Sequence, residues 1–208
     1  MPPTPPLLEA RALSFLRQDE AVFGPVDFAL HDGEVALVEG DNGSGKTTLM
    51  RVLTGMLHAD EGEVLLDGAP FSLDTMAGAV VFLGHHLGLK FDLSARENLA
   101  LSIGLYGVRE GIDSDAALAE VGLAGFEDEP VRRLSAGQKK RAALARLLLL
   151  PARVWLLDEP YANLDREGIA LVNRLLHDHA GRGGAALVTS HGAVSFAGDA
   201  PRRIRLHA

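Results

Sequence analysis

A short run of residues has the types and spacing that bind a phosphate chain. Gly40 and Gly45 are separated by four residues, and Lys46 and Thr47 follow directly. Glycines let such a turn fold so closely that its backbone N–H groups face phosphate oxygens, while the lysine adds positive charge. The sequence therefore predicts a site for ATP, with the hydroxyl of Thr47 on Mg²⁺. Its residues are Gly40, Asp41, Asn42, Gly43, Ser44, Gly45, Lys46, Thr47 and Thr48.

Two adjacent carboxylates end an apolar segment later in the chain. Asp158 and Glu159 follow residues 154–157, which are Val, Trp, Leu and Leu. By itself this would be a polar strand end entering a turn, but beside a phosphate-binding loop it resembles the Walker B motif. In that interpretation Asp158 binds Mg²⁺, and Glu159 polarises the attacking water as the general base.

Strands and helices alternate around these motifs. Apolar runs predict buried strands at 34–39, 79–83, 154–158 and 185–190, and helical spacing predicts a helix at 169–176. The fold class is therefore α/β, with a P-loop NTPase core. The first thirty-odd residues alternate apolar runs with polar turns, which indicates an antiparallel β subdomain beside the main sheet.

The chain is interpreted as one domain over residues 1–208. Residues 1–84 and 150–208 form the core with its β subdomain, and residues from about 85 to 149 form a helical subdomain. Within the helical part, Gly104, Gly107 and Gly111 are expected to break the helices.

Composition excludes several classes of protein. The net charge of −8 argues against a nucleic-acid partner, which needs clustered basic residues. Because there is no cysteine, a disulfide, a thiolate zinc site and an iron–sulfur cluster are all excluded. Residues 1–6 lack the features of a secretion signal. Arg146, Pro151 and Arg153 interrupt the most apolar stretch, so we expect no direct membrane insertion.

A third segment resembles the signature motif of the ABC ATPases. Leu134 and Ser135 are followed by Ala136, Gly137 and Gln138 about twenty residues before the two carboxylates. Asp165, with Asn163 and Leu164 before it, resembles the D-loop, and His191 resembles the switch histidine that contacts the γ-phosphate. The resemblance runs from about Leu7 to the C-terminus. It implies a homodimer with two equivalent sites, in which Ser135, Ala136, Gly137 and Gln138 close over the partner's ATP.

Two positions within the motifs depart from the ABC pattern. Ala136 stands where the family most often has glycine, and its methyl group is tolerated only if φ there is negative. His85 stands where the family usually has the Q-loop glutamine. The chain's only glutamines are Gln18 and Gln138, so His85 or His86 must contact Mg²⁺ or water instead. Since histidine changes charge near neutral pH and an amide does not, we expect a pH-sensitive turnover.

The aromatic residue that stacks on adenine in the family is also absent. Arg17 stands at its place, and a planar guanidinium can stack on a base, with Phe15 as the alternative. A solvated arginine on an edge strand is an equally good interpretation of Arg17.

A narrower resemblance rests on the segment after the strand at 79–83. Leu83, Gly84 and His85, then residues 88–90 and 93–99, are similar to the ATP-binding subunits of the bacterial cytochrome c maturation transporters, usually described as part of a haem exporter. The resemblance implies an ATPase that binds integral membrane transporter subunits and lies peripherally on the cytoplasmic face of the inner membrane. The alternative is an ABC exporter for another small hydrophobic solute, because cargo is selected by the membrane partner.

Three further residues have ordinary interpretations. His177 and His179 point about 200° apart on the predicted helix, so they cannot easily share a metal ion, and both are expected at the surface. Trp155 is expected to pack in the core.

Overall fold

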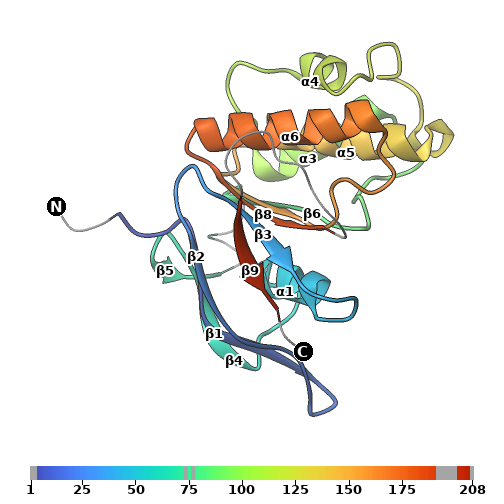
Figure 1. Ribbon diagram of the computed structural model, residues 1–208. Helices are drawn as coiled ribbons and strands as arrows, with labels where there is room; N and C mark the ends of the chain where they lie inside the picture. Colours follow the sequence, from blue (N-terminus) through green and yellow to red (C-terminus); the bar gives the residue numbers. More distant parts are fainter. Residues whose placement is uncertain (1–3, 73–74, 76–77, 191–200, 207–208) are drawn as a thin grey trace.

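The protein contains a parallel and an antiparallel sheet. The structure is a computed structural model that describes residues 4–72, 75, 78–190 and 201–206. One sheet is parallel, with the order β6 (Val80–Leu83), β7 (Val154–Leu157), β8 (Ala185–Thr189), β3 (Val35–Glu39) and β9 (Arg202–Arg205). The other is antiparallel, with the order β2 (Glu20–Leu30), β1 (Leu8–Arg17), β4 (Glu61–Leu66) and β5 (Ala69–Pro70) (Figure 1). The predicted α/β class with an antiparallel β subdomain is confirmed.

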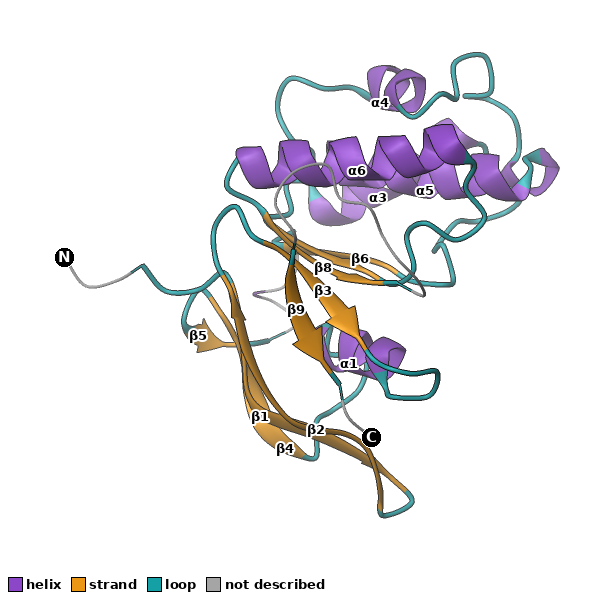
Figure 2. Cartoon of the chain, in the orientation of Figure 1, coloured by secondary structure: helices purple, strands orange, loops and turns teal. Residues whose placement is uncertain are grey.

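Helices cover both faces of the parallel sheet. Figure 2 shows α3 (Ala95–Tyr106), α5 (Ala136–Leu149) and α6 (Arg166–Gly181) on one side, with α4 (Ser114–Glu120) farther from the sheet. The short 3₁₀ helix η1 (Val131–Arg133) precedes α5. On the other side, α1 (Lys46–Leu53) and the antiparallel sheet pack together. The strands that carry the sequence motifs are therefore packed on both faces, by the helices on one side and by α1 with the antiparallel sheet on the other.

The central strands are buried on both faces, as strands of a covered parallel sheet must be. In β7, Trp155 and Leu157 point into the core under α3, α5 and α6, while Val154 and Leu156 join the core around α1. The same alternation occurs in β8. This explains why these strands are almost continuously apolar in the sequence, and the burial of Trp155 is as predicted.

Most predicted elements are confirmed, and two features differ from the sequence predictions. The four predicted strands and the helix at 169–176 correspond to β3, β6, β7, β8 and α6. The predicted break at Gly104 is wrong, because α3 continues through it and ends before Gly107, whose φ is 81°. A Cβ at Gly104 would meet nothing within 4 Å, so this glycine costs helix propensity without opposing the helix. Strand β9 was not predicted because three of its four residues are arginine.

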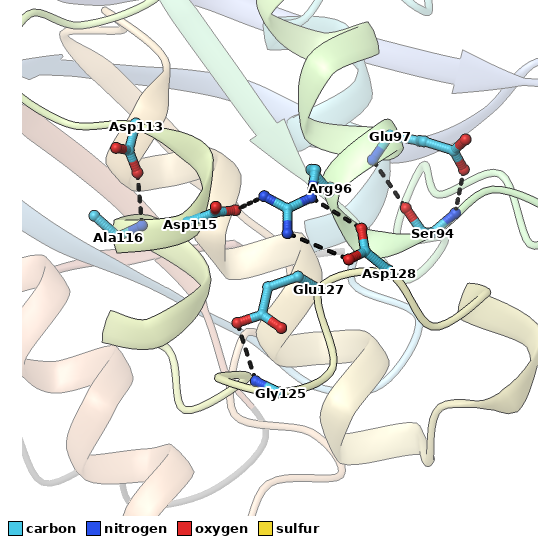
Figure 3. Close-up of polar contacts among 9 residues, drawn as sticks. All are labelled: Ser94, Arg96, Glu97, Asp113, Asp115, Ala116, Gly125, Glu127 and Asp128. Carbon is cyan, nitrogen blue, oxygen red and sulfur yellow. Dashed lines mark hydrogen bonds and ion pairs between the residues drawn. The ribbon is translucent and has the colours of Figure 1, made fainter.

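Polar contacts fix the start of α3, and Figure 3 shows those made by Ser94, Arg96 and Glu97. Ser94 and Glu97 form a reciprocal capping box at the start of α3. Arg96 pairs with Asp128 at 2.9 Å and with Asp115, which ties α3 to α4 and to the following loop (Figure 3). Asn98 is buried and binds both backbone polar atoms of Lys90. The residues that carried the narrower family resemblance therefore shape the loop that follows His85.

The prediction that His179 lies at the surface is wrong, whereas His177 is exposed. His179 is only 3% exposed, and its ring stacks on Trp155 with 3.8 Å between ring centroids. Its Nε2 donates to the carbonyl of Arg153 at 3.1 Å. Burial lowers the pKa of His179 to about 4, and the nearby charges of Arg109 and Arg182 act in the same direction. The residue is therefore a neutral part of the core.

Protonation of His179 should make the fold less stable in acid. Because its folded pKa lies below the ordinary value of about 6.5, its stabilising contribution is complete above pH 6.5 and is lost as the pH falls toward 4. The His179→Phe variant keeps the stack but cannot be protonated. Between pH 7 and 4.5, its free energy of unfolding in urea should fall by about 2 kcal/mol less than that of the wild type.

The exposed neighbour provides the matched control for this measurement. His177→Phe changes the same residue type on the same helix, and it should keep the pH dependence of the wild type. Parallel pH curves for the wild type and His179→Phe would contradict the assignment.

Candidate nucleotide-binding and hydrolysis site

The phosphate-binding loop connects β3 to α1 and packs against β2. Gly43 and Gly45 both have φ of 88°, a left-handed conformation that favours glycine. A Cβ at Gly45 would lie 2.8 Å from the carbonyl oxygen of Val22, so this position also requires a glycine for space. The loop therefore has the tight shape that the sequence predicts.

The polar groups of this loop suit an anion. Lys46 is 6% exposed, and its Nζ donates to the carbonyls of Gly40 and Asp41 at 2.6 and 2.9 Å. The Ser44 hydroxyl is buried and has no hydrogen-bond partner among the described residues. Thr47 and Thr48 lie in the first turn of α1, which contains no acidic residue. A buried hydroxyl without a partner, next to a lysine and a helix N-terminus, fits the oxygens of a phosphate chain.

Asp158 and Glu159 form a turn whose geometry depends on Thr189. The carboxylate of Asp158 is buried and accepts a hydrogen bond from Thr189 Oγ1 at 2.7 Å. Thr189 Oγ1 in turn accepts a hydrogen bond from the backbone N–H of Glu159 at 2.9 Å. Glu159 has φ of 52°, a conformation that non-glycine residues seldom adopt. Thr189 was not predicted as a site residue, although it ends the strand next to the one that carries Asp158.

One cavity of about 500 Å³ brings several predicted site residues together. Thr47, Asp158 and His85 all line it, and so does His86. A hydroxyl and a carboxylate are the oxygen ligands that Mg²⁺ prefers, so Thr47 and Asp158 fit the ion that the sequence predicts. His85 is exposed toward this space. The cavity also extends away from the nucleotide loop, to Met56, Tyr106 and Arg146.

The signature residues cap a helix. Ser135 is the N-cap of α5, where its Oγ accepts from the backbone N–H of Gln138 at 3.2 Å. The side chain of Gln138 accepts from the backbone N–H of Ser135 at 2.9 Å. Ala136 does not have a positive φ, which meets the condition for an alanine at this position. Ser135 and Ala136 are exposed, and none of the four signature residues lines the cavity of Thr47 and Asp158.

The D-loop residue Asp165 is the N-cap of α6. It accepts from the backbone N–H of Gly168 at 2.8 Å and pairs with Arg141 at 3.3 Å. The Gly168 N–H, and to a lesser extent Arg141, lower the pKa of this carboxyl. A Cβ on Gly137 would lie 3.5 Å from the carbonyl of Asn163, so the signature and D-loop segments are neighbours within one chain.

The predicted adenine contact falls on the β1–β2 hairpin. Phe15 is half-buried and stacks on Phe23 with 6.4 Å between ring centroids, and Phe23 lies beside Gly45. Arg17 is exposed at the end of β1, paired with Glu20 near the hairpin turn. Both candidates thus belong to the hairpin that contacts the phosphate-binding loop, and stacking by Arg17 stays a prediction. His191 lies outside the described residues.

The fold and the arrangement of the candidate site residues indicate the class of protein, which comparisons with known proteins identify. The ABC transporter family matches residues 23–162. Among solved structures, a putative ABC transporter ATP-binding protein from Pyrococcus furiosus superposes with a TM-score of 0.81 at 26% identity, covering 96% of this chain and 97% of the other. A dimeric ATP-binding cassette bound to ADP and Pi has the same fold, with a TM-score of 0.75 at 22% identity, covering 89% of this chain and 88% of the other. The chain is an ABC ATPase.

Curated relatives narrow the family. A cytochrome c biogenesis ATP-binding export protein, CcmA, from Xanthomonas campestris pv. campestris is 57% identical over 98% of this chain and 95% of its own length. The protein of the same name from Methylococcus capsulatus is 47% identical over 91% of this chain and 93% of its own length. Within the ABC ATPases, the chain therefore belongs to the family of cytochrome c biogenesis ATP-binding export proteins.

Replacement of His85 tests whether it does the work of the missing glutamine. A histidine changes charge between about pH 5 and 8, whereas an amide does not. In His85→Gln, the rate of ATP hydrolysis should therefore vary less with pH over this range than in the wild type. His86→Gln separates the two histidines of the cavity, and His58→Gln, at an exposed position after α1, serves as the control. A pH profile of His85→Gln that superimposes on the wild type would refute the role of His85.

Proposed function

We propose that this chain is the ATP-hydrolysing subunit of an inner-membrane ABC transporter complex for cytochrome c biogenesis, linked to haem export or handling. The observation that carries the proposal is the convergence of Thr47, Asp158 and His85 on one cavity in a chain that matches CcmA proteins over nearly its full length. The complex would place this subunit peripherally on the cytoplasmic face. Among the described residues, no helix is both long and apolar enough to cross a bilayer, so attachment would depend on partners.

Each residue of the candidate site would have a separate role in hydrolysis. Lys46 would exchange its bonds to the loop carbonyls for bonds to the β- and γ-phosphates. Mg²⁺, held by Thr47 and Asp158, would supply positive charge next to the phosphate oxygens. Glu159 would accept a proton from the attacking water, and His85 would orient that water. His191 would contact the γ-phosphate, as the family resemblance implies.

Two copies of the chain would be needed for turnover. The N-terminus of α5 is a suitable anion site, yet its residues do not line the cavity that holds Thr47 and Asp158 of the same chain. A homodimer places Ser135, Ala136, Gly137 and Gln138 of one copy over the ATP of the other, with Asp165 near the junction. The dimeric cassette that shares this fold and holds ADP and Pi supports such an arrangement.

The membrane subunits would bind where the cavity opens between α1 and α3. Met56 and Tyr106 line the cavity and are exposed, and Leu101 and Leu105 are exposed one turn apart on α3. Arg51 and Arg146 line the same cavity. We assign this surface to a cytoplasmic helix of an integral membrane subunit that carries apolar side chains and a carboxylate. Since His85 lines the same cavity, movement of that helix would reach the hydrolysis site.

A charge on this surface should break the association. Leu105 is 64% exposed, so Leu105→Asp should fold normally but co-purify with the membrane subunits at least tenfold less than the wild type. Phe126→Asp, at another exposed apolar residue, after α4, is the control and should co-purify normally. Thermal melting establishes that both variants are folded. Undiminished co-purification of Leu105→Asp would remove this surface from the proposal.

Replacement of Glu159 tests the proposed hydrolysis and pathway together. Glu159→Gln keeps the size of the side chain but cannot accept a proton, so hydrolysis should fall by about 10² to 10⁴-fold while ATP binding persists. ATP should then hold Glu159→Gln as a dimer in size-exclusion chromatography, and adding Ser135→Arg should prevent that dimer. In a strain that lacks the protein, wild type but not Glu159→Gln should restore haem-stained c-type cytochromes.

Each possible failure has a separate meaning. An unchanged hydrolysis rate in Glu159→Gln would contradict the general-base assignment. Normal cytochromes in the deletion strain would contradict the cytochrome c pathway and favour an ABC exporter for another small hydrophobic solute.

A further inference from the structure

A buried lysine connects the signature helix to the hydrolysis site. Lys140 lies in α5, five residues after Ser135, and is only 5% exposed. Its Nζ donates to the backbone carbonyl of Glu159 at 3.1 Å. Burying a lysine is unfavourable unless its ammonium group is bound, and buried lysines are therefore uncommon. Burial lowers the pKa of Lys140, while Asp158 and Glu159 oppose that effect. The lysine thus lies in the negative field of the two site carboxylates.

The residue that Lys140 contacts has a strained backbone. Glu159 has φ of 52°, which for a residue other than glycine needs support from its surroundings. Its N–H donates to Thr189 Oγ1, and its carbonyl accepts from Lys140 Nζ and, within the turn, from the backbone N–H of Ala162 at 3.2 Å. Two side chains from outside the turn therefore hold the two backbone polar atoms of Glu159. The direction of the Glu159 side chain depends on both of them, because a left-handed residue that relaxes points its side chain elsewhere.

The next residue of α5 contacts the other end of the same segment. Arg141 pairs with Asp165 at 3.3 Å, and it also donates to the carbonyl of Val121 at 3.0 Å. Lys140 and Arg141 thus attach α5 to both ends of the segment from Asp158 to Asp165. A displacement of α5 relative to β7 would change the contact with Glu159 directly.

We propose that Lys140 is a positioning residue for hydrolysis, which sets the orientation of Glu159 according to the position of the signature helix. This inference rests on the proposed roles of Glu159 as general base and of Ser135 at the partner's ATP. One end of α5 would then meet the partner's nucleotide while Lys140, on its second turn, orients the base at the chain's own nucleotide. Lys140 would link the two composite sites of the dimer.

This role predicts a separation of turnover from binding. Lys140 does not line the cavity of Thr47 and Asp158, so its removal leaves the nucleotide contacts in place. In the full-length chain with ATP and Mg²⁺, Lys140→Met should lower kcat about tenfold or more, while the Kd for ATP stays within about twofold of wild type. The dependence of the rate on ATP concentration should also become less cooperative. Because Met has a similar volume and fills the same space, the fold should be retained, and the melting temperature measures any structural loss.

Two variants complete the experiment. Lys140→Arg keeps a cationic donor at this position and should recover a substantial part of the lost kcat. Lys139→Met makes the same change at the neighbouring residue, whose Nζ lies over the ring of Phe91 instead, and should keep the kcat of the wild type. Wild-type kcat and cooperativity in Lys140→Met would overturn the proposal. A joint loss of ATP affinity and melting temperature would also overturn it, because that result indicates a structural role alone.

Glu159→Gln, measured in parallel, separates this inference from the proposed function. If Glu159→Gln abolishes hydrolysis and Lys140→Met does not slow it, only the positioning role fails. If Glu159→Gln hydrolyses ATP at the wild-type rate, the general-base assignment fails, and the role of Lys140 fails with it.

Discussion

The parallel pairing of β6, β7, β8 and β3 is the constraint on which the site depends. Leu83 pairs with Leu157, Leu157 with Val188, and Val38 with Thr189, so these strands end at one edge of the sheet. The phosphate-binding loop, the Asp158–Glu159 turn and His85 come just after those ends, and Thr189 is the last residue of β8. Parallel pairing with both faces covered requires apolar residues throughout, and β7 and β8 supply them. The same strand packing that builds the core therefore also places the candidate site residues together at one edge of the parallel sheet.

Several residues that match a sequence motif also stabilise the start of a helix. Ser135 and Gln138 satisfy each other's backbone N–H groups, so two of the four signature residues are needed to begin α5 whether or not a nucleotide is present. Ser94, Glu97 and Asn98 do the same for α3 and for the loop after His85. Apart from His85, the narrower family resemblance was thus carried mainly by residues that fix a loop, which explains how it identified the relatives with few candidate catalytic groups.

The sequence was sufficient to predict the motifs and the helices and strands whose buried residues recur periodically. The phosphate-binding loop, the main strands and the antiparallel subdomain follow from local patterns, because glycine geometry and apolar runs are local properties. Thr189 and Lys140 were missed because their partners are about 31 and 19 residues away, and no local pattern marks such a contact. His179 was assigned to the surface for the same reason, since only the neighbouring strand supplies Trp155. Strand β9 lacks an apolar run and depends on pairing with β3.

Helix α5 contacts the core, the Glu159 turn and the start of α6, and its N-terminus is exposed. Its N-terminus is exposed and suited to an anion, its second turn binds the backbone of Glu159 and the N-cap of α6, and its apolar residues pack on Trp155 and Leu157. A rigid helix transmits displacement along its axis with little loss, whereas the left-handed Glu159 turn has few alternative conformations that keep its hydrogen bonds. Under the role proposed for Lys140, movement at the exposed end of α5 would change the backbone contact at Glu159. A phosphate-binding loop alone would hold nucleotide in a monomer, whereas under the role proposed for Lys140 the attachment of this helix to the carboxylate turn would make hydrolysis depend on a second copy of the chain.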